Sequence, residues 1–230
     1  MHSAMVGIRE KLERVRAAME EAARKGGRSA NDITLVAVTK GASPEAVAEA
    51  REAGLSIFGE SKVQEAETKI PQAGGPAEWH MVGHLQTNKV KTAVSLFNLI
   101  QSVDSVRLAK AVSDESAALG KVTPVLLEVN ISGEAKRFGF SPEEIYAGME
   151  AAAGMPGIRV TGLMGIAPHP ADEGSKRAAF KKLKSVFSVC KALKRPNLEM
   201  KYLSMGMSDD YKIAIEEGSN MIRLGRALFS

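Results

Sequence analysis

The chain contains a single cysteine, Cys190, so it cannot form an internal disulfide bond, which indicates a reducing compartment. Cys190 follows Phe180, Leu183 and Phe187 at helical spacing, as expected of a small core residue. The N-terminus lacks the continuous apolar segment of a signal peptide, and no apolar run is long enough to span a bilayer. Proline, glycine and serine nowhere cluster into a linker. We therefore expect a cytoplasmic protein with one domain over residues 1–230.

Two common binding signatures are also missing from the sequence. No G-x-G-x-x-G motif follows the first predicted strand, which removes the main sign of a dinucleotide-binding sheet. His80 and His84 are four residues apart but lack the glutamate of the H-E-x-x-H zinc motif, and they lie in a predicted strand. The 31 basic and 27 acidic residues are mixed along the chain, and a net charge of +4 does not favour nucleic acid or a membrane surface as partner. Such a balance remains compatible with a small anionic ligand.

Short apolar strands alternate with helical patterns after an amphipathic first helix. Ile8, Leu12, Val15 and Met19 form the apolar face of that helix, which Gly26 and Gly27 end. The predicted strands are residues 33–40, 55–60, 78–84, 97–104, 123–130, 158–165, 199–206 and 221–225. This alternation predicts a single (β/α)₈ TIM barrel with an extra N-terminal helix. The last helix is short, so we expect the first helix to cover part of the barrel.

Lys40 ends the first predicted strand, and such barrels carry their active groups at the carboxyl ends of strands. Period-2 alternation places Val36, Val38 and Lys40 on one face, so Lys40 faces the barrel if the valines do. A lysine amine held at an apolar mouth is desolvated, which favours the neutral nucleophile that Schiff-base chemistry needs. The alternative is a lysine that extends into solvent from a strand end.

The last two strands are followed by segments typical of the phosphate site in these barrels. Gly206 and Gly225 allow backbone N–H groups to approach an anion, and Ser204 and Ser208 add hydroxyls. The alternative for Ser208 is that it caps the helix beginning at residues 209–211. We also assign Met164 and His84 to the rim of the site, because both follow or end predicted strands. A hydrogen-bonded rim histidine without ligand contact is an equal alternative for His84.

Arg223 lies inside the last predicted strand, on the same face as Met221 and Gly225. An arginine inside a barrel is costly unless it has a partner, and a ring nitrogen or a carboxylate would supply one. The alternative is an internal ion pair with Glu60, Glu128 or Asp104.

These motifs resemble those of the pyridoxal phosphate homeostasis proteins, also called the proline synthetase co-transcribed homologue family. The resemblance rests on the strings VAVTK, WHMVGHLQTNKVK, VNISGEAKRFGF, GLMGIAP and LSMGMSDDYKIAIEEGSNMIRLGRALF. It implies a barrel similar to the N-terminal domain of alanine racemase, with pyridoxal 5′-phosphate (PLP) on Lys40. It further implies that Arg223 faces the pyridine nitrogen and that residues 204–208 with Gly225 and Arg226 hold the phosphate. One departure is Ser61-Lys62, where the family usually has Asn-Tyr, which places a second amine near the mouth.

The resemblance implies a PLP-homeostasis protein without established turnover, in transient contact with PLP-dependent apoenzymes. No exposed apolar face is obvious in the sequence, so we expect a monomer. A PLP-dependent amino-acid racemase is the alternative, but alanine racemases take a second base, a tyrosine, from an added C-terminal domain. Of the three tyrosines, only Tyr202 or Tyr211 could substitute for it, since Tyr146 lies in a predicted outer helix. A Schiff-base aldolase acting on phosphorylated sugars is a third hypothesis, and it would bind no PLP.

Overall fold

The computed structural model describes residues 7–230, and its eight strands form a closed parallel barrel in which β1 also pairs with β8. The strands are β1 (Thr34–Val38), β2 (Ile57–Glu60), β3 (Glu78–Met81), β4 (Leu99–Val103), β5 (Thr123–Val129), β6 (Ile158–Gly165), β7 (Leu198–Ser204) and β8 (Met221–Leu224). The predicted TIM barrel is therefore confirmed. Residues 1–6 of the predicted domain lie outside the described residues.

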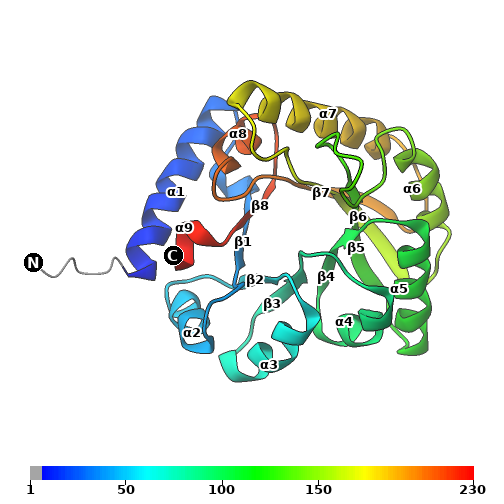
Figure 1. Ribbon diagram of the computed structural model, residues 1–230, viewed down its shortest axis with the longest axis horizontal. Helices are drawn as coiled ribbons and strands as arrows, with labels where there is room; N and C mark the ends of the chain where they lie inside the picture. Colours follow the sequence, from blue (N-terminus) through cyan, green and yellow to red (C-terminus); the bar gives the residue numbers. More distant parts are fainter. Residues whose placement is uncertain (1–6) are drawn as a thin grey trace, which may run out of the picture.

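The helices form a ring outside the strands (Figure 1). They are α1 (Ile8–Lys25), α2 (Pro44–Glu52), α3 (Val63–Ala73), α4 (Val90–Leu96), α5 (Val106–Ala118), α6 (Ile145–Ala153), α7 (Glu173–Lys191), α8 (Tyr211–Glu216) and α9 (Arg226–Phe229), with 3-10 turns η1 (Ala30–Asp32) and η2 (Thr87–Lys89). None of the helices within residues 7–230 is both long and apolar enough to cross a membrane.

The extra helix α1 completes the ring beside the short α9, as the sequence predicts. Its apolar face is buried, and it packs against α8, α9 and α2. Lys11 Nζ donates to the carbonyl oxygen of Ser230 over 2.9 Å, which ties α1 to the C-terminus. The helix ends at Gly26, and the next residue, Gly27, has φ +67, a left-handed conformation that favours glycine.

Side chains alternate between two cores, as the period of the strands requires. The larger core lies between the strands and the helices and includes Cys190, as predicted. The smaller core fills the barrel and consists of Val36, Leu99, Leu126, Met164 and Met221. The residue two positions further along the same strand from each of these also faces the interior. This alternation determines which candidate site residues point into the barrel.

Side-chain hydrogen bonds precede α2 and α6. Ser43 Oγ accepts from the N–H of Ala46 at the start of α2. Ser141 and Glu144 form the reciprocal capping box, with Glu144 N–H donating to Ser141 Oγ and Ser141 N–H to the Glu144 carboxylate. The helix itself, α6, begins one residue after the box.

Candidate functional site at the barrel mouth

Lys40 lies in a turn that follows β1, two residues beyond the end of the strand. The N–H of Ala42 donates to the carbonyl of Thr39 over 2.9 Å, and Gly41 has φ +74, as the third position of a type II turn requires. The Lys40 side chain is exposed. The expectation that an apolar mouth desolvates this amine is therefore wrong, because the turn carries Lys40 out of the strand and into solvent. The amine remains accessible to a ligand at the mouth.

A buried ion pair holds the base of this turn. Lys69 of α3 contacts Glu60 Oε1 at the end of β2, and its Nζ also donates to the Thr39 carbonyl over 2.6 Å. Thr39 Oγ1 donates to the same carboxylate over 2.6 Å. The sequence reasoning missed Lys69. Its spacing of three from Ala66 and four from Ala73, both buried, places it on the apolar face of α3, and this is the signal that could have found it.

Lys62, the second amine expected near the mouth, has a partner of its own. It precedes α3, its side chain is 62% exposed, and its Nζ lies 3.0 Å from Glu65 Oε1. The preceding residue, Ser61, lies against the segment that follows β3, because a Cβ at Gly83 would be only 2.2 Å from the Ser61 carbonyl oxygen.

Arg223 points into the barrel from β8, as alternation predicts, and is 4% exposed. Its Nη1 donates to Ser204 Oγ over 2.6 Å, and its Nη2 donates to the carbonyl of Gly165 over 3.1 Å. No carboxylate of residues 7–230 lies within 4.0 Å of the guanidinium, so the alternative of an internal ion pair is wrong; Glu60 pairs with Lys69 instead. Burial lowers the pKa of Arg223 to about 10, so the guanidinium is still charged at neutral pH.

Ser204 is fully buried, and its hydroxyl is used inside the barrel. Besides accepting from Arg223, it donates to Gln101 Oε1 over 2.6 Å. Ser204 therefore supports the guanidinium and does not offer its hydroxyl to the mouth. Gln101, on the interior face of β4, is a second residue that the sequence reasoning missed.

The two predicted anion-binding segments are tied together. Ser208 Oγ accepts from the backbone N–H of Ala227 over 3.2 Å, which joins the segment after β7 to the first turn of α9. Ser208 therefore does not cap α8, whose N-cap is Asp210, and that alternative is wrong. The Arg226 guanidinium contacts the Asp209 carboxylate, and Asp210 Oδ1 accepts from the N–H of Met207 over 2.6 Å. Both acidic residues of the segment after β7 thus have partners: Asp209 pairs with Arg226 of the segment after β8, and Asp210 accepts a hydrogen bond within its own segment.

The glycines of these segments sit where a side chain would not fit. Gly206 has φ +97, and a Cβ there would lie 2.6 Å from the Cβ of Ala214 in α8. A Cβ at Gly225 would lie 3.2 Å from the carbonyl oxygen of Val38 in β1. The backbone of both segments therefore packs closely against its neighbours, as a cradle built from N–H groups requires.

The remaining predicted residues border this centre on two sides. Met164 is fully buried in the apolar interior core, below the segments described above. Glu128 faces the interior from β5, opposite Met164, and is 8% exposed. Burial, together with the nearby Asp104 carboxylate, raises the pKa of Glu128 to about 7. From the sequence, Glu128 was named only as an alternative ion-pair partner of Arg223, not as an acid–base group.

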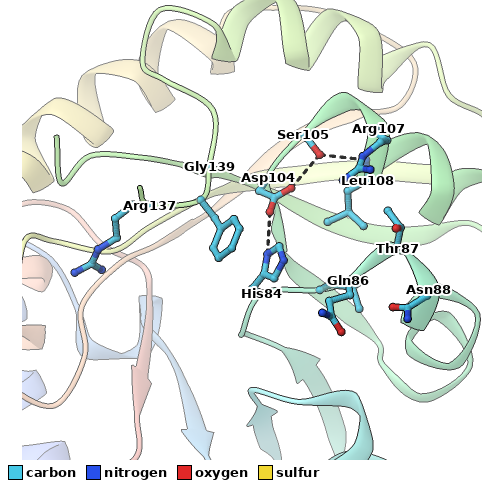
Figure 2. Close-up of a pocket in the computed structure, with 12 residues that line it drawn as sticks. His84, Gln86, Thr87, Asn88, Asp104, Ser105, Arg107, Leu108, Arg137 and Gly139 are labelled. Carbon is cyan, nitrogen blue, oxygen red and sulfur yellow. Dashed lines mark hydrogen bonds and ion pairs between the residues drawn. The ribbon is translucent and has the colours of Figure 1, made fainter. Parts of the chain in front are cut away.

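His84 belongs to a side pocket of about 590 Å³. Figure 2 shows its imidazole pointing toward Asp104, with Nδ1 3.0 Å from Oδ2. The ring stacks on Phe138, with the centroids 3.6 Å apart. The pocket is lined by the segments after β3, β4 and β5 and by the first turn of α5, and none of its lining belongs to the segments after β7 and β8. The basic segment that contains Lys136 and Arg137 is mostly exposed.

The residues present fit a ligand that combines an anion with a ring acceptor. The segments after β7 and β8 are joined by the Ser208–Ala227 hydrogen bond and carry Gly206 and Gly225, as an anion cradle requires, and Arg223 is a buried cation with no carboxylate of residues 7–230 within 4.0 Å. Val36 of β1 is the register partner of Arg223, and Lys40 follows four residues later, so Lys40 lies beyond Arg223 toward the carboxyl end of the barrel.

Comparison with known proteins identifies the family. Residues 11–230 match the family described as "Alanine racemase, N-terminal domain". The "Pyridoxal phosphate homeostasis protein" of Pseudomonas aeruginosa is 39% identical over 226 residues, covering 98% of this chain and 96% of that protein. The protein of the same name from Aquifex aeolicus is 35% identical, covering 96% of each.

Comparison with solved structures agrees with this family assignment. A structure of PipY from Synechococcus elongatus with PLP bound is 30% identical, with a TM-score of 0.84, covering 97% of this chain and all of that one. An alanine racemase of Clostridium difficile, at 15% identity and a TM-score of 0.72, shares the fold over 55% of its length. The resemblance expected from the motifs is confirmed: the chain belongs to the pyridoxal phosphate homeostasis proteins, a family built on the alanine racemase N-terminal domain.

Proposed function

We propose that this chain binds PLP, holds it as a Schiff base on Lys40, and thereby takes part in intracellular PLP homeostasis. The observation that carries the proposal is the placement of Lys40, in the turn after β1, and Arg223, on the neighbouring strand β8, beside a cradle closed by the Ser208–Ala227 hydrogen bond. When bound, PLP supplies an aldehyde and an electron-accepting ring. The Lys40 nitrogen forms a bond to the aldehyde carbon, and water leaves.

Each residue of the mouth has a proposed part in binding. The N–H groups around Gly206, Ser208, Gly225 and Arg226 hold the phosphate. Arg223 donates to the ring nitrogen, and Ser204 acts through Arg223. Met164 supports the ring from below, and His84 borders the site from the side pocket.

The proposed role is that of a carrier and not of an enzyme. The chain would buffer a reactive aldehyde and pass it to PLP-dependent apoenzymes through transient contacts. We propose that it acts in the cytoplasm, as one domain and as a monomer. The single cysteine, which allows no internal disulfide, agrees with that compartment.

A racemase-like enzyme is the second candidate, and one observation favours it. Glu128 places a carboxyl with a pKa of about 7 in the mouth, where it could serve as an acid or a base. Its partner in a two-base reaction would be Lys40.

Borohydride reduction of the PLP-loaded protein, followed by peptide mapping, tests the main proposal. We expect a visible absorption band that borohydride abolishes, and a reduced adduct on Lys40. Lys40→Ala should lose the band, whereas the matched control Lys62→Ala should keep it, because Lys62 is paired with Glu65 outside the barrel. An adduct mapped mainly to Lys62 or to another lysine would overturn the assignment.

A further inference from the structure

A chain of hydrogen bonds crosses the interior of the barrel from Arg223 to the opposite end. Arg223 Nη1 lies 2.6 Å from Ser204 Oγ, which lies 2.6 Å from Gln101 Oε1. Gln101 Nε2 lies 2.9 Å from Nδ1 of His80, and His80 Nε2 lies 2.8 Å from Glu78 Oε1. Four of these side chains are at most 4% exposed, and Glu78, at the start of β3, is 48% exposed. The chain therefore begins at the mouth and ends in solvent at the amino ends of the strands.

Donor chemistry gives every bond of this chain the same direction. A guanidinium can only donate, so Ser204 accepts from Arg223 and uses its own proton toward Gln101 Oε1. The amide nitrogen of Gln101 can only donate, so His80 Nδ1 accepts. A neutral imidazole then carries its proton on Nε2 and donates it to the Glu78 carboxylate. The second amide hydrogen of Gln101 has a partner too, Met221 Sδ at 3.3 Å.

The interior of a barrel is ordinarily filled by branched apolar side chains. Placing an amide, a hydroxyl and an imidazole there costs free energy unless every donor and acceptor is satisfied. Here they are satisfied, and Arg223 is the charged group at the mouth end of the hydrogen-bond chain. What the arrangement achieves is a restricted orientation of that guanidinium, because donation to Gln101 fixes the directions of the Ser204 lone pairs that accept from it, and the Gly165 carbonyl holds its other nitrogen.

We propose that Gln101 and His80 are positioning residues that orient the Arg223 guanidinium toward the ligand in the mouth. They do so by holding Ser204 as an oriented acceptor for Nη1, which leaves the remaining guanidinium donors directed by the Gly165 carbonyl and the ligand. The inference rests on the proposed function only in that a ligand ring meets Arg223. The direction of the hydrogen bonds is a property of the protein without ligand.

The first test is nitrogen-15 NMR of the histidine rings in the full chain at neutral pH, with and without added PLP. Comparison with a His80→Gln variant assigns the His80 signals among the four histidines. We expect a neutral ring protonated on Nε2 in both samples. A proton on Nδ1, or on both nitrogens, would overturn the proposed direction of the hydrogen bonds. This measurement does not require that any variant binds PLP.

The second test changes Gln101, with the neighbouring Ser102→Ala as control. Ser102 is buried on the same strand, and its hydroxyl has no hydrogen-bond partner among residues 7–230. Gln101→Leu should shift the visible band of the loaded protein and weaken PLP binding on the order of tenfold, the scale of one lost hydrogen bond to a charged group. Ser102→Ala should do neither. An unchanged band and affinity in Gln101→Leu would refute a positioning role.

Gln101→Glu gives a readout that loss of packing would not produce. Both oxygens of the new carboxylate accept, so Nδ1 of His80 must carry a proton while Nε2 still faces Glu78. We expect the His80 signals to become those of an imidazolium at neutral pH, and a neutral ring would contradict the inference. Loss of covalent attachment at Lys40 in the unaltered protein would refute the proposed function and would leave the His80 result unaffected.

Discussion

Lys69 donates a hydrogen bond from Nζ to the carbonyl oxygen of Thr39, 2.6 Å away, and so ties α3 to the residue that precedes Lys40. The same ammonium contacts Glu60, and both side chains are buried. The exposed Lys40 therefore extends from a turn whose base is buried and tied by hydrogen bonds.

Removing Lys69 should destabilise the protein strongly. Lys69→Met leaves the Glu60 carboxylate buried without its cation, and we expect the free energy of unfolding to fall by about 3–5 kcal/mol. Urea unfolding followed by circular dichroism measures the change. Adding Glu60→Gln to Lys69→Met should restore part of it, because no buried charge remains. The exposed pair supplies the control: Lys62→Met should cost less than about 1 kcal/mol. Equal losses for the two single variants would contradict this account.

Glu128 should make stability depend on pH. Burial raises its pKa from the usual 4.5 to about 7, so the folded protein favours the neutral carboxyl. The resulting contribution to the free energy of unfolding, about 3 kcal/mol, is fully present below pH 4.5 and is lost as the pH rises through about 7. Glu128→Gln stays neutral, so its stability relative to the unaltered protein should increase over this range. Urea unfolding at pH 5 and pH 8 measures it. Glu134→Gln, in an exposed segment, should show no such difference between the two pH values.

Arg223 should keep the ring nitrogen of bound PLP unprotonated. A charged guanidinium can only donate a hydrogen bond, and its positive charge disfavours a proton on the nearby ring nitrogen. The ring is then a weak electron sink, which suits a carrier. Nitrogen-15 NMR of labelled PLP reports the protonation state directly. Arg223→Glu should yield a protonated ring nitrogen. Arg226→Ala should weaken PLP binding without changing the protonation state of that nitrogen. A protonated nitrogen in the unaltered protein would refute the hypothesis.

Racemisation of amino acids should be absent or very slow. The reaction needs a base on each face of the substrate, and the three tyrosines are poorly placed for it. Tyr146 is exposed on α6, Tyr202 lies deeper in the barrel than Ser204, and burial raises the pKa of Tyr211. Chiral chromatography after incubation with L-alanine measures any turnover. A rate of about 1 s⁻¹ or more would favour the racemase. If Glu128→Gln abolished that rate, Glu128 would be the second base.

Much of the architecture could be predicted from the sequence because it follows from local periodicity. The spacing of Ile8, Leu12, Val15 and Met19 predicts the extra helix, and alternation within the last strand correctly turns Arg223 inward. These properties depend only on the geometry of a helix or a strand, so neighbouring residues in the chain determine them.

Only the tertiary structure decided which side chains meet. An internal ion pair was the alternative for Arg223, but the barrel brings it to Ser204, whose other partner, Gln101, is 103 residues away in the chain. Lys69 reaches Thr39 across 30 residues. Lys40, expected inside an apolar mouth, leaves the strand in a turn. Strand periodicity states which face a residue occupies, whereas closure of the barrel determines what lies opposite, and that depends on the register of all eight strands.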